Sequence, residues 1–191
     1  MMTNWLADIH KHNEAFRKRV SEASLPTARA PGPAVITCMD PRVNLAALGL
    51  PAFAEDGSNP SAVRVIRTIG AMAEERSLII GIFLANVSEI VVLMHTDCGC
   101  CLAHQNIDRI IERMQERLPP SAFKDYKRKV GEPFRERLLE HLSTFQDPFE
   151  AVKKEVARIR ALPYTPNDLI VHGLVYTLAT GEAEVVVDGD A

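Results

Sequence analysis

The feature that most restricts the fold of this chain is Ile90 to Met94, an unbroken run of five apolar residues. Such a run suits a central strand of a parallel sheet, because both faces of that strand are covered and no alternation with polar residues is needed. The run is far shorter than the roughly eighteen apolar residues that a membrane span requires, and no other run approaches that length. We therefore expect a soluble α/β fold organised around this strand.

Short apolar runs alternate with stretches of helical spacing along the rest of the chain. Further strands are expected at Ala34–Thr37, Ala62–Ile66, Leu169–Tyr176 and Ala183–Val187. Helices are expected at Glu74–Asn86, at Ile107–Leu118, and from the capping residue Asp147 onward. Alternating strands and helices imply right-handed crossovers, and Ala179-Thr180-Gly181 favours a hairpin between the last two strands. The predicted fold class is α/β: a mostly parallel central sheet of four strands plus an antiparallel C-terminal edge strand, with helices on both faces.

Composition sets the broad class and excludes several functions. With 191 residues, 47% of them hydrophobic and 25% charged, residues 1–191 are expected to form a single domain. Within it we expect a leading helix and connector over residues 1–32 and a peripheral helical segment over residues 121–146. The net charge of -3 gives no basic footprint for nucleic acid or for a membrane surface. Because the N-terminus lacks an apolar signal core, the expected location is the cytoplasm, where cysteines are kept reduced.

Two stretches that directly follow predicted strands carry the chemistry. Cys38, Asp40 and Arg42 stand at alternate positions of a chain leaving the first strand, so all three can point the same way. His95 and Cys98 follow the central strand. Because ligands of open α/β sheets gather at the carboxyl ends of the strands, we expect the two stretches to meet there.

The residue types indicate a metal site rather than a disulfide framework. Cys38, His95 and Cys98 are the three ligands that a catalytic zinc site needs when its fourth position stays open for water. Cys98 is also expected near the start of the next helix, where the helix dipole favours a thiolate. Two thiolates cancel the charge of Zn2+, so the ion should acidify its water less than in an all-histidine site. Asp40 could then accept the water's proton or hydrogen bond, or occupy the open position itself, while Arg42 holds it ionised through a two-pronged pair.

Other polar residues near these stretches have structural interpretations. Cys100 and Cys101 are interpreted as packing residues of the first helical turn, since neighbours about 100° apart on a helix cannot both face one ion. Asp97, between two ligands, is interpreted as a turn or capping residue. His172 lies in an apolar strand and is interpreted as a hydrogen-bonded core or interface histidine. For His104, a proton shuttle and a surface histidine are both open.

The motif Cys-Met-Asp-x-Arg followed by His-Thr-Asp-Cys-Gly resembles the two signature motifs of the β-class carbonic anhydrases, especially of their small single-domain members. The similarity continues through Val63–Gly70, Glu89–Val92, Val171–Leu174 and the Thr180-Gly181 hairpin. It covers most of the chain from Pro33 onward, and Ser121 to Gln146 is the least similar part.

This resemblance implies an activity, a cofactor and an assembly. The family hydrates CO2 to bicarbonate and a proton, and it is built from dimers in which the leading helix packs on the neighbouring subunit. The residues concerned would be Cys38, His95 and Cys98 as ligands of one Zn2+ per chain, Asp40 and Arg42 as the catalytic dyad, and Gly70 and Gly99 in substrate binding. In some members the aspartate of the dyad binds zinc directly in a closed, inactive state, so Asp40 has two candidate positions.

The chain departs from the family pattern after its second predicted strand. Where the family commonly has Asn-Ala-Gly, this chain has Thr68-Ile69-Gly70, which affects the shape of the pocket. A carbonyl sulfide or carbon disulfide hydrolase on the same scaffold is therefore an alternative, because these linear substrates differ from CO2 mainly in length and polarity. The alternative from another class is a non-catalytic, redox-responsive zinc or thiol protein that uses Cys98, Cys100 and Cys101.

Overall fold

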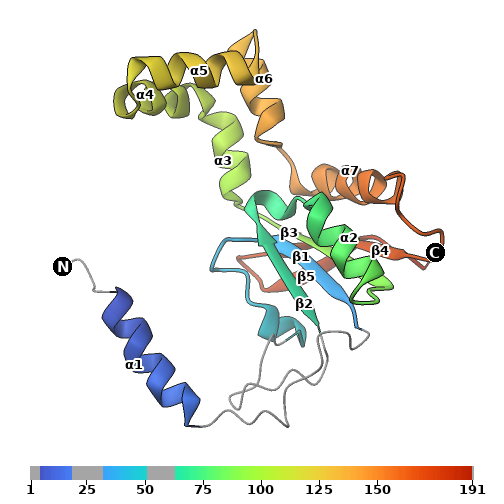
Figure 1. The fold of residues 1–191 in the computed structure, drawn as a ribbon. Helices are drawn as coiled ribbons and strands as arrows, with labels where there is room; N and C mark the ends of the chain where they lie inside the picture. The colour runs from blue at the N-terminus through green and yellow to red at the C-terminus, as the bar shows by residue number, and fades with distance from the viewer. Residues whose placement is uncertain (1–4, 19–31, 51–62, 191) are drawn as a thin grey trace.

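The computed structural model describes residues 5–18, 32–50 and 63–190, and its centre is a five-stranded sheet (Figure 1). The strand order is β2-β1-β3-β4-β5, with β4 and β5 antiparallel and the other neighbours parallel. The strands are β1 (Ala34–Cys38), β2 (Arg64–Thr68), β3 (Glu89–His95), β4 (Ile170–Thr177) and β5 (Glu182–Val187). The apolar run lies in β3, at the centre of the sheet, and the predicted fold class is confirmed.

Helices connect the strands and form an extension beyond the sheet. The α-helices are α1 (Trp5–Arg17), α2 (Glu75–Phe83), α3 (Gly99–Gln105), α4 (Ile107–Arg117), α5 (Pro120–Val130), α6 (Phe134–His141) and α7 (Pro148–Arg160). Two short 3-10 helices, η2 (Leu45–Leu48) and η3 (Ile69–Ala71), follow β1 and β2. Asp147 caps α7 as predicted, because its Oδ1 accepts a hydrogen bond of 2.9 Å from the N–H of Phe149. The connector expected before β1 falls mainly on residues 19–31, outside the described residues.

Alternate side chains of the sheet face two different layers. On one face, Ile90, Val92 and Met94 of β3 belong to a core shared with α2 and α7. On the other face, Leu93 belongs to a core that includes Leu45 of η2. An all-apolar strand is stable because both of its faces are covered in this way. The parallel pairing of β1 with β2 and β3 also holds the carboxyl ends of these three strands side by side.

The segment between α3 and α7 forms a helical extension. Helices α4, α5 and α6 project away from the sheet in Figure 1 and share their own apolar cluster, which includes Ile107, Phe134 and Leu138. The division of the chain into a leading segment, a core and a peripheral segment stays a prediction. Among the residues that the structure describes, no helix is both long enough and apolar enough to cross a membrane.

Candidate metal centre

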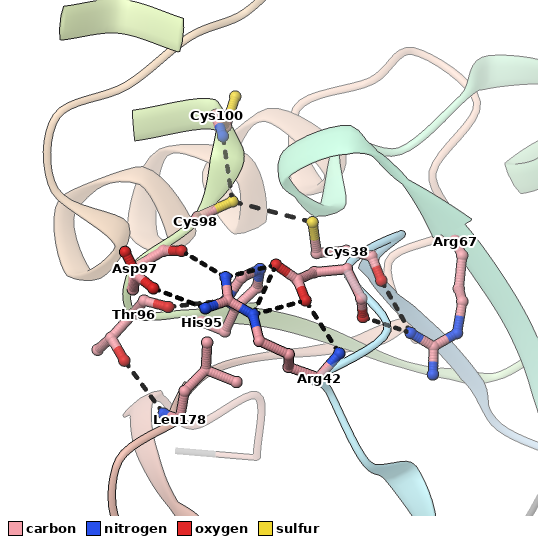
Figure 2. Close-up of polar contacts among 10 residues, drawn as sticks. Cys38, Arg42, Arg67, His95, Thr96, Asp97, Cys98, Cys100 and Leu178 are labelled. Carbon is pink, nitrogen blue, oxygen red and sulfur yellow. Dashed lines mark hydrogen bonds and ion pairs between the residues drawn. The ribbon is translucent and has the colours of Figure 1, made fainter. Parts of the chain in front are cut away.

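Three buried side chains converge at the carboxyl ends of β1 and β3. Cys38 ends β1, His95 ends β3, and Cys98 caps the N-terminus of α3. One ligand atom from each residue lies within 4.8 Å of the others, and the two cysteine Sγ atoms are 3.8 Å apart (Figure 2). All three residues are buried. The structure therefore brings together the three metal-type ligands that the sequence predicts.

The imidazole of His95 is oriented for metal binding. Its Nδ1 lies 2.8 Å from the carbonyl oxygen of Thr96, which can only accept a hydrogen bond, so Nδ1 carries the proton. Its Nε2 then holds the lone pair, and this buried atom has no hydrogen-bond partner within the described part of the chain. Leaving a buried polar atom unsatisfied is unfavourable, and a metal ion would satisfy it. Two sulfurs and one imidazole nitrogen, with a backbone carbonyl behind the histidine, fit Zn2+.

The hydrogen bond between the side chains of Cys38 and Cys98 shifts their pKa values in opposite directions. The hydrogen bond from the Cys98 side chain lowers the pKa of Cys38, against the opposing effect of burial. Smaller contributions in the same direction come from His95 and from the backbone N–H groups of Asp40 and Gly70. The contact with Cys38, together with burial, raises the pKa of Cys98. The site thus stabilises the thiolate of Cys38, which is the form of cysteine that binds metal, with Cys98 donating to it as a thiol.

Asp40 and Arg42 form the predicted two-pronged pair, but through a turn. The strand ends at Cys38, and the N–H of Val43 donates to the carbonyl oxygen of Asp40 at 3.2 Å, with Pro41 at the second position of the turn. Arg42 Nε and Nη2 donate to Asp40 Oδ1 and Oδ2 at 3.0 and 2.7 Å. The strand-like alternation from which a shared direction of Cys38, Asp40 and Arg42 was expected therefore does not continue past Cys38. Proline favours the turn, and Arg42 folds back onto Asp40.

The pair keeps Asp40 ionised. Hydrogen bonding by the Arg42 guanidinium lowers the pKa of Asp40 to about 2, and the carboxylate in turn raises the pKa of Arg42. The carboxylate lies outside the group of three converging ligand atoms. Of the two candidate positions of Asp40, the structure thus shows the one that is paired with arginine.

Sequence reasoning missed the residues that anchor this pair. Asp97 has a φ of 53° and accepts two hydrogen bonds from Arg42, through Oδ2 at 2.6 Å and through its backbone carbonyl at 2.9 Å (Figure 2). Arg67 donates to the backbone carbonyls of Cys38 and Val43 at 2.9 and 3.1 Å. Two features of the sequence could have indicated them: the acidic residue Asp97 between two candidate ligands, and the basic residue Arg67 at the end of β2. Neither observation identifies the groups to which Asp97 and Arg67 are bonded, and only the turn role of Asp97 was predicted.

Gly70 and Gly99 both lie next to the cluster. Gly70 has a φ of +66°, and a Cβ there would be 3.0 Å from Cys100 Sγ and from the ring of Phe145. Gly99 follows Cys98 and begins α3. Their contribution to substrate binding stays a prediction. Cys100 is buried against Phe145, as its interpretation as a packing residue requires.

Gly70→Ala is expected to lower the free energy of unfolding by about 3 kcal/mol. A left-handed backbone at alanine costs about 1 kcal/mol, and the added methyl group would overpack the contact with Cys100 and Phe145 by about 2 kcal/mol more. Gly49→Ala is the matched control, because Gly49 has a φ of +69° but no described residue lies within 4 Å of its Cβ position. Urea unfolding of both variants checks this expectation. Equal losses at the two glycines would show that packing against the site contributes nothing.

The histidines outside the cluster are held by other contacts. His104 Nδ1 is 3.0 Å from Thr144 Oγ1, and its Nε2 is 2.9 Å from Gln146 Nε2. With both ring nitrogens engaged, His104 joins α3 to the segment that leads into α7, and the structure favours a structural role over a proton shuttle. His172 Nδ1 accepts a hydrogen bond of 3.0 Å from the N–H of Gly189, as predicted for a hydrogen-bonded histidine.

The fold and the cluster together describe an α/β protein with a candidate metal centre, and similarity to known proteins identifies the family. The family model described as "Carbonic anhydrase" matches residues 33–183. The chain belongs to the carbonic anhydrase family, in its β class. β-Carbonic anhydrase 1 of Mycobacterium tuberculosis is 25% identical over 156 residues, which cover 80% of this chain and 80% of that protein.

Solved structures show the same fold. β-Carbonic anhydrase isoform I of Trichomonas vaginalis matches with a TM-score of 0.71 at 23% identity, covering 99% of this chain and 100% of that chain. The apo form of a carbon disulfide hydrolase matches with a TM-score of 0.55 at 23% identity, covering 96% of this chain and 90% of that chain. At these identities the likeness establishes the fold and does not select a substrate.

Proposed function

We propose that this protein is a zinc-dependent carbonic anhydrase that catalyses the reversible hydration of CO2 to bicarbonate and a proton. The observation that carries the proposal is the Nε2 of His95, which has no hydrogen-bond partner among the described residues and converges with the sulfurs of Cys38 and Cys98 beside an Asp40–Arg42 pair. One Zn2+ per chain, held by the three ligands, would supply Lewis acidity and lower the pKa of a water at its open position.

The geometry assigns Asp40 an orienting role. A carboxylate with a pKa of about 2 is a weak base, far from the pKa that suits proton transfer near neutral pH. It remains a strong hydrogen-bond acceptor, and its side chain is only 15% exposed. We therefore assign Asp40 to accepting a hydrogen bond from the reacting water and so fixing its direction, in preference to storing its proton.

Arg42 determines the direction in which that carboxylate points. It contacts both oxygens of Asp40 and is itself held by the side chain and the backbone of Asp97. Holding the guanidinium from two sides restricts the carboxylate to one orientation, which is the kind of preorganisation that catalysis requires. Asp97 is thus a positioning residue for the dyad.

A second substrate class is favoured by one observation. Ile69 is 46% exposed although it is apolar, and its Cδ1 lies 3.9 Å from the position that a Cβ would take on Gly99. An apolar side chain thus stands beside the residue that follows the ligand Cys98. Apolar pocket walls suit apolar substrates, so carbonyl sulfide and carbon disulfide are the alternative substrates on the same site.

Turnover of the three substrates by one zinc-loaded sample tests these alternatives. We expect the rate of proton release from CO2 hydration, followed by stopped flow with a pH indicator, to exceed sulfide release from carbonyl sulfide and from carbon disulfide. Faster sulfide release would replace CO2 with the alternative substrate. Absence of turnover with all three would contradict both.

A homodimer or higher homo-oligomer is part of the same proposal. It is supported by exposed apolar side chains on α1 and α2: Leu6, Ile9, Ile80 and Phe83 are 64%, 57%, 54% and 60% exposed. Exposed apolar groups of this kind mark interaction surfaces when they are clustered. Sedimentation equilibrium checks it, and a solution mass of 21.1 kDa, that of one chain, would contradict it. The cytoplasmic location stays a prediction.

A further inference from the structure

The turn that follows β2 has an unfavourable backbone conformation. Gly70 and the next residue, Ala71, both have positive φ, of 66° and 60°, and Ala71 is completely buried. Positive φ is natural for glycine but costs alanine about 1 kcal/mol. Two consecutive residues of this kind persist only where the surrounding structure holds them in place.

Two sets of contacts hold this turn. Locally, Thr68 Oγ1 donates to the carbonyl oxygen of Met72 at 2.7 Å. From α7, Glu155 Oε1 accepts a hydrogen bond of 2.7 Å from the N–H of Ala73, and Arg158 Nη2 donates to the carbonyl oxygen of Ala73 at 2.9 Å. Both backbone polar groups of Ala73 are thus held by one helix. Thr68, which departs from the family pattern, takes part in holding the turn.

Glu155 and Arg158 also bind each other. Arg158 Nη2 and Nε lie 2.7 and 2.8 Å from the two carboxylate oxygens of Glu155, which is only 3% exposed. The Arg158 side chain is 44% exposed, so the pair is buried on the Glu155 side only. Such a pair contributes little stability, because an apolar pair of similar volume is often as stable or more stable. An apolar pair, however, could not form the two hydrogen bonds to the backbone of Ala73.

The turn lies beside the ligand Cys38 and against Cys100, which is hydrogen-bonded to the ligand Cys98. Cys38, the last residue of β1, pairs with Thr68, the last residue of β2, and the turn begins directly after Thr68. The Cβ position of Gly70 is 3.0 Å from the side chain of Cys100, whose own N–H donates to Cys98 Sγ at 3.4 Å. A displacement of the turn would therefore change the surroundings of Cys38 and move Cys100, whose N–H donates to the other ligand, Cys98. Groups that hydrogen-bond to metal ligands tune metal affinity and ligand orientation.

We propose that Glu155 and Arg158 are positioning residues of the metal centre, which hold the Gly70-Ala71 turn against Cys38 and Cys100 through the backbone of Ala73. The proposal rests on the metal centre of the proposed function but is independent of its substrate. It predicts that a pair on α7, distant in sequence from every ligand, sets how tightly and in what geometry the two sulfurs bind metal.

Substitutions of Glu155 test the proposal with two readouts other than catalysis. Zinc affinity is measured by competition with a chelator, and the thiolate-to-cobalt charge-transfer absorption is measured on the Co2+-substituted protein. Glu155→Ala is expected to weaken zinc binding about 10-fold and to shift the cobalt absorption. Glu155→Gln keeps an oxygen that accepts from Ala73, so it is expected to restore most of both signals.

The matched control lies on the same helix. Glu150 pairs with Lys153 at 2.8 Å with the same spacing, but its side chain is 58% exposed and its carboxylate is bonded to Lys153, whereas that of Glu155 is bonded to the backbone of Ala73. Glu150→Ala should therefore match the wild type in zinc affinity and in the cobalt spectrum. An equal change in this variant would show that any loss of charge on α7 has the same effect, and would overturn the proposal.

A double variant separates positioning from folding. Glu155→Ala leaves Arg158 unpaired, whereas Glu155→Leu with Arg158→Met removes both charges and keeps apolar packing. We expect the double variant to fold and still to show weakened zinc binding with a shifted cobalt spectrum, because Ala73 has lost both partners. Wild-type affinity and spectrum in the folded double variant would overturn the proposal. If the wild type binds metal but fails to hydrate CO2, the proposed function fails while these metal readouts still decide this inference.

Discussion

His95→Ala is expected to abolish zinc binding and CO2 hydration together. His95 supplies the only nitrogen among the three converging ligand atoms, and its Nε2 has no other partner in the described structure. Without His95, only two cysteines would remain to bind the ion, whereas a catalytic zinc site has three protein ligands. The zinc content should fall from one ion per chain to nearly none, and turnover should fall to the uncatalysed rate. Metal analysis and stopped-flow hydration on one preparation measure both.

The matched control for this variant is His141→Ala. His141 ends α6 in the helical extension, where its ring lies 6.2 Å from that of Tyr126, and it is not among the converging ligand residues. This variant should keep its zinc and its turnover. Circular dichroism of both variants verifies that the chain is folded. A folded His95→Ala protein that retains one zinc per chain and full turnover would show that the three residues are not the ligands.

Asp40→Asn is expected to reduce kcat about 10²- to 10³-fold while the zinc content stays at one ion per chain. Asparagine has nearly the same shape, but it removes the charge that attracts Arg42 and replaces one acceptor oxygen with a donor. The ligands are unchanged, because the carboxylate lies outside the cluster. The expected loss is typical of a residue that takes part in proton transfer or orients the reacting group. Steady-state kinetics and metal analysis together check the expectation.

Asp97→Asn is expected to reduce kcat less than Asp40→Asn does. Its carboxylate is 64% exposed, and exposed ion pairs contribute only about 1 kcal/mol or less. Its backbone carbonyl would still accept from Arg42. We expect a loss of less than about 10-fold, well below that of Asp40→Asn. A non-catalytic zinc or thiol protein predicts the opposite pattern, in which Asp40→Asn leaves function intact.

The fold was predictable because its signals are local. Periodicity and turn chemistry each predict structure from a few neighbouring residues. This holds for the apolar run of β3, the capping residues of α7 and the hairpin residues before β5. The convergence of the candidate ligands was predictable for a related reason, because the carboxyl ends of adjacent parallel strands must meet at one edge of a sheet. Cys38 and His95 follow from that rule alone, and Cys98 follows from its position at a helix start.

The supporting contacts were not predictable because they join distant segments through the backbone. Arg67 is bonded to carbonyl oxygens of the turn after β1, and Glu155 to the N–H of Ala73, 82 positions away. Every residue has a backbone carbonyl, so the sequence does not indicate which of them accepts a hydrogen bond from a distant side chain. The turn at Asp40 to Val43 was missed for a different reason: alternate spacing was given more weight than the preference of Pro41 for a turn.

Stopped-flow CO2 hydration by the wild-type protein loaded with one zinc per chain tests the central claim most directly. The account predicts rapid, zinc-dependent proton release that is lost when the metal is removed by a chelator and restored when zinc is returned. A protein that holds one zinc per chain and yet shows no hydration above the uncatalysed rate, at alkaline as well as neutral pH, would contradict it.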